Sequence, residues 1–318
     1  MLYPLQFRAV FRRYLWGGRR LQTALGKPLA EGADWAESWE IVDRGAEQSI
    51  VENGPLAGTK LGDLVSRYGE ELLGRHHPQT RFPLLFKFLD ANQTLSVQVH
   101  PDDRYAAKLE PPDLGKTEAW VVLEALPGSR IYAGLRPGVG REQLVEAIRA
   151  GRCGECLASF EPAVGDCVYL PAGTVHALGA GLLVAEIQQS SDVTYRIFDW
   201  NRVGVDGRPR LLHIEQALEA IDFEQSAAVP QRPRSIGLGV LRLVECDKFV
   251  LDRWEMSSAM VAGGDDRCHI LAILEGEIRV SDDGPWLGRG GTILLPASLG
   301  LTRVVPRTGA RVLDVYLP

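Results

Sequence analysis

Two polar side chains occupy one face of a short predicted strand, LSVQVHPDD (95–103). The odd-numbered positions at its start carry Leu, Val and Val, whereas Gln98 and His100 fall at even-numbered positions. Alternate side chains of a strand lie on the same face, so Gln98 and His100 point in the same direction. An amide oxygen and an imidazole nitrogen placed together could bind a metal ion. The alternative is that both side chains form the solvated face of a half-buried strand.

A histidine and a glutamate further along the chain could complete such a site. Residues 165–176 have the spacing G-x5-P-x-G-x2-H and end at His176. This spacing resembles the second motif of the cupin jelly roll, in which the histidine faces into the barrel and binds a metal. The first cupin motif normally has His-x-His and then Glu. Here Gln98-x-His100 stands in its place, and the acid is delayed to Glu118 in GKTEAW.

Four segments together resemble one particular cupin family. YLWGGRRL, LSVQVHPDD, GKTEAW and PAGTVHALGAGLLVAEIQQSSDVTYRIFDW are similar to type I phosphomannose isomerase in its short bacterial form, over nearly the whole chain and most strongly from residue 80 to 202. The resemblance implies an enzyme that interconverts mannose 6-phosphate and fructose 6-phosphate with one zinc ion. The implied zinc ligands are Gln98, His100, Glu118 and His176. A donor set of nitrogen and oxygen without thiolate suits a borderline cation that keeps a position open for substrate.

Aldose–ketose isomerisation moves a proton between neighbouring carbons through an enediol. It requires a base, an electrophile at the sugar oxygens and an anchor for the phosphate. Arg196 in SDVTYR matches the active-site arginine of the family, and its guanidinium could stabilise enediolate charge or bind phosphate. Lys116 lies two residues before Glu118 and should therefore reach the same cavity. We expect both cations to contribute to catalysis and substrate binding.

Further charged residues could also take part in the chemistry. Glu186 and Asp192 precede Arg196 and could relay protons or orient a base, or they could be surface salt-bridge partners. Lys87 interrupts the apolar run FPLLFKFLDA (82–91), where it could bind substrate or extend its amino group to solvent. The residue that accepts the substrate proton is left open at this stage.

The elements that must position these residues are mostly short strands. Runs with β-branched or alternating residues, bounded by Pro, Gly and Asp, predict strands; they cover 82–91, 95–101, 118–125, 129–135, 166–173, 182–189, 269–280 and 290–304. Helical periodicity predicts three helices; they cover 59–74, 141–151 and 213–221. This pattern predicts a mainly β protein of two cupin-type jelly-roll barrels with a few short helices.

The barrels are expected to form two domains, a metal-binding one over 1–229 with helical insertions and a metal-free one over 230–318. The Pro- and Arg-rich stretch 228–237 is interpreted as the linker. In the second half, the motif spacing recurs from Gly290 but has Leu301 where the first half has histidine. His269 and Glu275 occupy first-motif positions there, and two ligands out of four make a second metal site improbable.

Composition and charge narrow the class of protein. The chain has 318 residues, of which 45% are hydrophobic and 24% are charged, as in ordinary globular proteins. The net charge of −6 argues against nucleic acid as a partner, and no apolar run is long enough for a membrane span. Five scattered cysteines, including a lone Cys153-x-x-Cys156, favour a reducing cytoplasm over a disulfide framework. The five arginines of the first 20 residues are interpreted as part of the fold.

Two rival functions remain at the level of sequence. His100, Glu118 and His176 alone form the two-His-one-carboxylate set of a non-haem iron cupin oxygenase. A fourth ligand, Gln98, and nearby cations favour a small anionic substrate instead. The other rival is a non-catalytic cupin that binds a sugar phosphate, because binding and turnover share most contacts.

Overall fold

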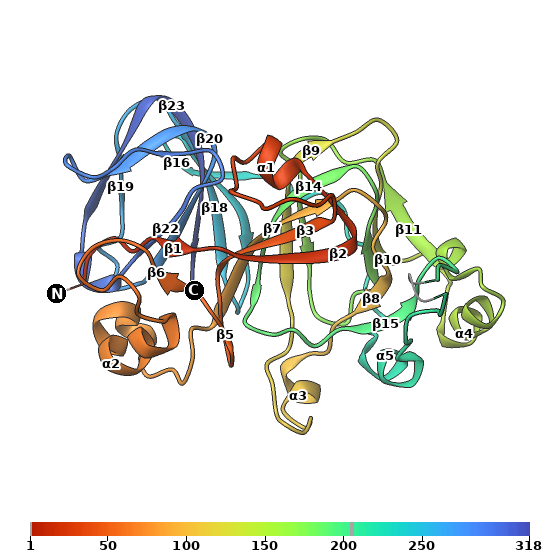
Figure 1. The fold of residues 1–318 in the computed structure, drawn as a ribbon. Coiled ribbons are helices and arrows are strands. Elements are labelled where there is room, and N and C mark those ends of the chain that lie inside the picture. The colour runs from red at the N-terminus through yellow and green to blue at the C-terminus, as the bar shows by residue number, and fades with distance from the viewer. Residues whose placement is uncertain (1, 204–206) are drawn as a thin grey trace.

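The computed structural model describes residues 2–203 and 207–318 and is mainly β, with a few short helices (Figure 1). The first barrel is formed by two sheets. The five-stranded sheet has the order β11 (Leu157–Phe160), β10 (Ile131–Leu135), β13 (His176–Leu178), β8 (Val97–Val99) and β15 (Tyr195–Phe198). The six-stranded sheet has the order β12 (Cys167–Leu170), β9 (Glu118–Ala125), β14 (Leu182–Gln189), β7 (Leu84–Ala91), β3 (Trp35–Ile41) and β2 (Val10–Gly18).

The second barrel contains the strands that follow residue 233. Its main path is β16 (Arg234–Gly237), β17 (Val240–Glu245), β18 (Val250–Met256), β23 (Thr302–Tyr316), β20 (His269–Val280) and β21 (Leu287–Gly288). Two further strands pair beside this path: β19 (Met260–Ala262) pairs with β23, and β22 (Thr292–Leu295) pairs with β20. Two small ribbons pair β1 (Phe7–Arg8) with β6 (Ile50–Val51), and β4 (Asp43–Arg44) with β5 (Glu47–Gln48).

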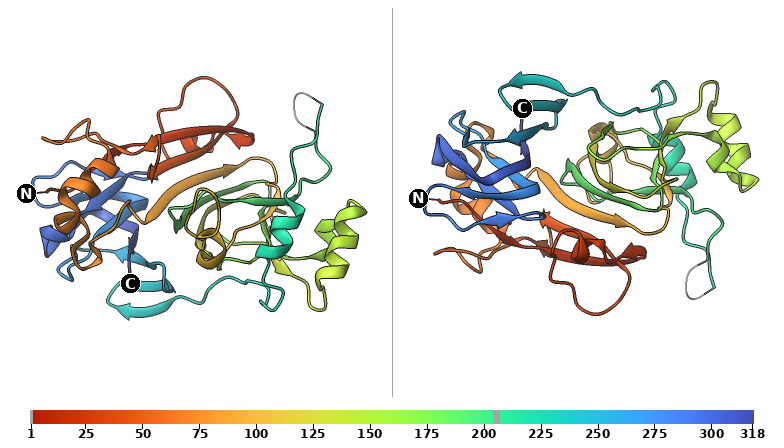
Figure 2. Two further views of the ribbon diagram at one scale, coloured as in Figure 1. Left: turned by 90° about the horizontal axis from the view of Figure 1, so that it is seen from below. Right: turned by 90° about the horizontal axis from the view of Figure 1, so that it is seen from above.

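The helices lie at the periphery of the strands (Figures 1 and 2). They are α1 (Arg20–Thr23), α2 (Leu61–Leu73), α3 (Asp103–Ala106), α4 (Arg141–Arg149) and α5 (Ile214–Ala220), with 3-10 turns η1 (Gly74–His76), η2 (Cys153–Cys156) and η3 (Ala297–Leu299). The three helices predicted from periodicity correspond to α2, α4 and α5. The arginine-rich first 20 residues belong to β1, β2 and the start of α1, as expected.

The central strands β7 and β14 of the six-stranded sheet are buried on both faces, which explains why apolar residues occupy most positions of β7. Every residue of β7 is buried. Phe86 and Phe88 pack in a core shared with the second barrel, whereas Leu89 packs in the core between the two sheets of the first barrel. Lys87 has the same strand phase as Leu89 and therefore points into the first barrel.

Two expectations about the chain's second half were wrong in part. Residues 234–237 of the expected linker form β16, which pairs with β17. The side chains of β16 are exposed, so backbone pairing leaves no hydrophobic pattern to detect. The expected strand over 290–304 is interrupted by η3, and Leu301 is 79% exposed. Leu301 therefore does not lie inside the second barrel, whereas His176, its counterpart in the repeated spacing, lies inside the first.

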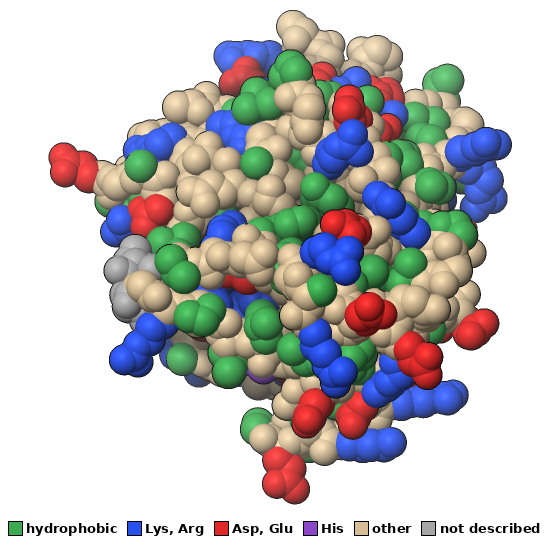
Figure 3. Space-filling model, turned by 90° about the vertical axis from the view of Figure 1, so that its right-hand side faces the viewer, with side chains coloured by type: hydrophobic (Ala, Val, Ile, Leu, Met, Phe, Trp, Pro, Cys, Tyr) green, Lys and Arg blue, Asp and Glu red, His purple; other side chains and the backbone are tan. Residues whose placement is uncertain are grey.

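Contacts between the two halves are extensive. Leu5, near the N-terminus, pairs with Leu294 of β22, and α2 contacts η3. Both termini lie at the second barrel (Figure 2). At the opposite end of the molecule, Lys and Arg side chains are interspersed with Asp and Glu side chains (Figure 3). The division into two domains near residue 230 stays a prediction.

Candidate active site

Three neighbouring strands of the five-stranded sheet place polar side chains side by side. Gln98 of β8 is the direct partner of His176 on β13 and of Arg196 on β15. The Gln98 amide nitrogen lies 3.3 Å from His176 Nε2. Antiparallel partners face the same side of a sheet, so the three side chains belong to one face. This face is turned toward the interior of the barrel and lines a cavity there.

His100, Glu118 and His176 form a compact buried cluster whose ligand atoms lie within 4.8 Å of one another. Glu118 begins β9 in the opposite sheet, and its Oε1 lies 3.2 Å from His176 Nε2. Its Oε2 lies 3.6 Å from His100 Nε2. Glu118 Oε1 is buried and accepts no hydrogen bond from the described residues. A buried carboxylate oxygen without a donor is expected to have another partner, and a cation fits this position.

The two imidazoles direct their Nε2 atoms toward this cluster, where Lys116 Nζ lies 3.0 Å from His100 Nε2 and the Gln98 amide nitrogen lies 3.3 Å from His176 Nε2. His100 Nδ1 lies 2.8 Å from the Val193 carbonyl, and His176 Nδ1 lies 2.9 Å from the Thr174 carbonyl. Because a carbonyl only accepts, each Nδ1 carries the proton, which is the usual arrangement of metal-binding histidines. Burial, followed by the nearby Lys116 charge, lowers the pKa of His176 to about 4 and that of His100 well below its usual range. Both rings are therefore neutral near pH 7.

Lys116 reaches the same cluster from the loop before β9. Its Nζ lies 2.5 Å from Glu118 Oε2 and 3.0 Å from His100 Nε2. Glu186 Oε1 lies 3.6 Å away on the other side. The structure thus places this ammonium group between the candidate metal ligands and an acid of the cavity.

A buried row of two charged side chains flanked by two tryptophans crosses the six-stranded sheet. Trp120, Glu186, Lys87 and Trp39 are successive cross-strand partners on β9, β14, β7 and β3. Trp120 Nε1 donates to Glu186 Oε2 at 3.2 Å. Lys87 Nζ lies 3.4 Å from Glu186 Oε1 and 3.6 Å from Glu37 Oε2.

Neither Lys87 nor Glu186 lies at the surface, because they are only 6% and 2% exposed. The alternatives of a solvent-directed lysine and a surface salt bridge are therefore wrong for these two residues. Burial opposes the charge of Lys87, but the Glu186 and Glu37 carboxylates outweigh it and raise its pKa. Burial raises the pKa of Glu186. Asp192, in contrast, is exposed at the rim of the cavity.

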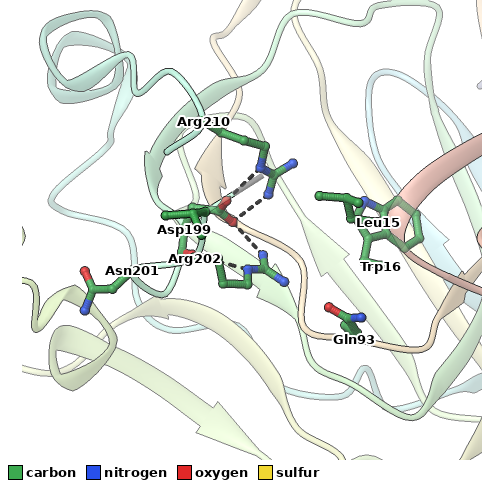
Figure 4. Close-up of a pocket in the computed structure, with 8 residues that line it drawn as sticks. Leu15, Trp16, Gln93, Asp199, Asn201, Arg202 and Arg210 are labelled. Atoms are coloured by element: carbon green, nitrogen blue, oxygen red, sulfur yellow. Dashed lines mark hydrogen bonds and ion pairs between the residues drawn. The ribbon is translucent and has the colours of Figure 1, made fainter. Parts of the chain in front are cut away.

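These residues surround a cavity of about 240 Å³. Its lining includes Tyr14, Trp16, Glu37, Lys87, Gln98, Lys116, Glu186, Asp192, Arg196 and Arg210. The Arg196 Nε donates to Ser96 Oγ at 3.1 Å, and its Nη1 donates to the Leu211 carbonyl at 3.0 Å. A second cavity of about 510 Å³ shares Trp16 and Arg210 with the first (Figure 4).

Sequence reasoning missed four charged residues of these cavities, which are Glu37, Asp199, Arg202 and Arg210. Glu37 was detectable in principle, because alternation in WAESWEI places Trp35, Glu37 and Trp39 on one strand face. Its carboxylate accepts a hydrogen bond from Trp39 Nε1 at 2.5 Å. Arg210 lies in a polar loop without periodicity, and no local signal distinguished it from the other arginines there.

Two other candidate clusters have different environments. Cys153 and Cys156 are buried free thiols, and burial raises the pKa of Cys153 to about 12. His269 in the second barrel lies 2.8 Å from Asp314 and 3.1 Å from Asp265.

No helix in the described ranges is long and apolar enough to cross a membrane.

The fold and the site define a cupin-type barrel with a candidate metal-ligand cluster. The model of the type I phosphomannose isomerase catalytic domain matches residues 4–116. A probable mannose-6-phosphate isomerase of Bacillus subtilis is 36% identical over 304 residues, which cover 94% of this chain and 95% of that protein. A mannose-6-phosphate isomerase of Streptococcus mutans is 35% identical over 302 residues, 94% of each chain.

A solved structure of a mannose 6-phosphate isomerase is also similar to this chain. The crystal structure of mannose 6-phosphate isomerase from Bacillus subtilis matches with a TM-score of 0.89 at 30% identity, and the match covers 100% of both chains. The chain belongs to the type I phosphomannose isomerase family. The predicted fold class, mainly β with two cupin-type barrels and a few short helices, is confirmed.

Proposed function

We propose that this protein is a zinc-dependent aldose–ketose isomerase that interconverts mannose 6-phosphate and fructose 6-phosphate through an enediol or enediolate. The observation that carries the proposal is that the His100, Glu118 and His176 cluster contacts Gln98 and Lys116, which line a cavity together with Arg196. The names of the similar bacterial proteins support the choice of substrate.

Gln98, His100, Glu118 and His176 would hold the zinc ion. Zinc bound there would supply a Lewis acid that polarises the sugar's carbonyl and hydroxyl oxygens. Two neutral imidazoles, one carboxylate and one amide leave room for substrate oxygen. The unpartnered Glu118 Oε1 supports this assignment over a purely structural role for the cluster.

The remaining charged residues would stabilise charge, bind the sugar oxygens and transfer the proton. Arg196, held by Ser96 and a backbone carbonyl, would stabilise the negative charge of the enediolate. Lys116 would donate hydrogen bonds to sugar oxygens beside the metal ligands. Glu186 and Asp192 are the candidates for holding and moving the proton between neighbouring carbons. Lys87 is flanked by two carboxylates, so we assign it the task of orienting Glu186.

The test is a coupled assay for fructose 6-phosphate formed from mannose 6-phosphate, on chelated, zinc-loaded and iron-loaded protein. The proposal expects activity that disappears on chelation and returns with zinc. Tight sugar-phosphate binding without turnover would contradict it in favour of a binding protein. Oxygen consumption by the iron-loaded protein alone would contradict it in favour of an oxygenase.

A reducing compartment such as the cytoplasm is also part of the proposal. It is supported by the five cysteines, which are all free thiols. Thiol titration of the unfolded, freshly purified protein with and without reductant tests this point, and five titratable thiols without reductant are expected.

A further inference from the structure

Positive charge exceeds negative charge where the two cavities meet. Asp199 accepts hydrogen bonds from Arg210 Nε at 2.7 Å and Nη2 at 2.5 Å, and from Arg202 Nη2 at 2.5 Å. Arg196 has no carboxylate within ion-pair distance among the described residues, and its guanidinium donates to the Ser96 hydroxyl and the Leu211 carbonyl. Two guanidinium groups, Arg202 and Arg210, thus share one carboxylate, and Arg196 is a third guanidinium without one. The outer surface near this end, in contrast, carries both signs interspersed (Figure 3).

Arg210 is the arginine of this group that lines both cavities. Its two bonds to Asp199 form a fork that holds the guanidinium in one orientation. In Figure 4 the Arg210 and Arg202 guanidiniums lie on the side of Asp199 that faces Leu15 and Trp16. Arg202 also donates to the Thr94 carbonyl at 2.6 Å, so it ties Asp199 to the neighbouring loop.

The electrostatics of Arg196 also favour an anion bound near Arg210. Burial, followed by the positive charge of Arg210, lowers the pKa of Arg196. Two guanidiniums that repel each other in a partly buried cavity are both stabilised by an anion between them. A phosphate group has the charge and the acceptor geometry that arginine forks bind.

We propose that Arg210 binds the phosphate group of the sugar phosphate at the junction of the two cavities, and that Asp199 is the positioning residue that orients it. This inference rests on the proposed function. The reacting carbons and the phosphate lie at opposite ends of a six-carbon sugar, so their binding groups must be separate. Arg210 lies outside the His100, Glu118 and His176 cluster and makes none of its contacts, as this separation requires. With Arg210 on the phosphate, Arg196 remains available for the enediolate.

The test compares Arg210→Ala, Arg210→Lys and Asp199→Asn with Arg149→Ala, which removes an exposed arginine from α4. Three quantities are measured: KM and kcat for mannose 6-phosphate, kcat/KM for unphosphorylated mannose, and calorimetric binding of inorganic phosphate to the zinc-loaded protein. Thermal unfolding of each variant shows whether the fold is retained.

We expect Arg210→Ala to raise KM for mannose 6-phosphate by about 10- to 100-fold, the value of a charged hydrogen bond, with a smaller change in kcat. Its preference for mannose 6-phosphate over mannose should fall by a similar factor, and phosphate binding should weaken in parallel. Arg210→Lys should recover part of the loss, because it keeps the charge without the fork. Asp199→Asn should raise KM without a change in kcat, and Arg149→Ala should match wild type.

An unchanged KM and unchanged phosphate binding in a folded Arg210→Ala variant would overturn the inference while leaving the isomerase proposal intact. If the wild-type protein binds phosphate through Arg210 but does not isomerise mannose 6-phosphate, the proposed function fails and the anion site stands. Phosphate binding therefore separates the two proposals.

Discussion

Gln98 and His176 are opposed on neighbouring antiparallel strands, and the Gln98 amide nitrogen lies 3.3 Å from His176 Nε2. Arg196 faces Gln98 from the other side. One residue of β8 therefore lies between a candidate metal ligand and the candidate enediolate-binding arginine. The polar phase of this strand faces the barrel interior and is not a solvated face.

Replacement of one candidate ligand should remove the metal without disturbing the strand. Glu118→Gln keeps the side-chain volume but loses the charge. Loss of a residue that only orients a metal ligand typically lowers metal affinity by about 10- to 100-fold, so we expect loss of a ligand to lower zinc affinity by more than this. Zinc content after gel filtration and competition with a chromophoric chelator measure this without an activity assay. Glu124→Gln on the same strand, whose partner is Arg289, is the control and should keep wild-type affinity. Unchanged affinity in Glu118→Gln would refute the ligand set.

Arg196 should matter for the chemical step more than for substrate affinity. We expect Arg196→Ala to lower kcat by about 100- to 1,000-fold, as for loss of a donor to a developing oxyanion. Arg196→Lys should recover only part, because an ammonium cannot reproduce the guanidinium fork. Ser96→Ala removes one anchor of Arg196 and should cost less than about tenfold. Steady-state kinetics with mannose 6-phosphate check this, and a change confined to KM would contradict it.

Removal of Lys87 should destabilise the fold, because Glu37 and Glu186 would remain buried without their shared cation. For Lys87→Met we expect a loss of about 3–5 kcal/mol in the free energy of unfolding. The loss should shrink at acid pH, where the carboxylates become neutral. Denaturant unfolding at two pH values measures both effects, with exposed Lys108→Met as the control. A loss below about 1 kcal/mol at neutral pH would show that the pair is not a buried ion pair.

Deprotonation of His269 should lower the free energy of unfolding as the pH rises into the alkaline range. Burial opposes its charge, but Asp314 and Asp265 outweigh burial and raise its pKa from 6.5 to about 9. Folding thus favours the protonated ring, so its contribution is fully present below pH 6.5 and is lost as the pH rises through about 9. The contribution is about 3 kcal/mol, at roughly 1.4 kcal/mol per pH unit.

The measurement is the free energy of unfolding from pH 6 to pH 10 for wild type and His269→Asn. The wild-type value should fall over this window relative to the variant, and the two curves should converge at alkaline pH. His77→Asn, which changes an exposed histidine, should follow wild type. Parallel curves for wild type and His269→Asn would contradict the prediction.

Parts of the candidate metal site left local signals in the sequence, whereas the resemblance to a family implied the complete ligand set. Gln98 and His100 share a strand phase, and the spacing of residues 165–176 determines the turn before His176. The sequence also showed that Lys87 interrupts an apolar run, but it did not show the environment of the Lys87 ammonium group. Whether that ammonium reaches solvent depends on which sheet covers it, and only packing shows that Glu37 and Glu186 flank it.

The sequence by itself determined the residue types of the candidate metal site, the mainly β architecture and the family, since strand alternation and motif spacing act over a few residues. The tertiary structure alone decided that β8 and β9, from opposite sheets, bring Glu118 within 3.6 Å of His100, and that Arg210 reaches the cavity of Arg196. Such contacts depend on how two sheets and a loop pack against each other. Residues that meet only through packing leave no spacing in the chain that could reveal them.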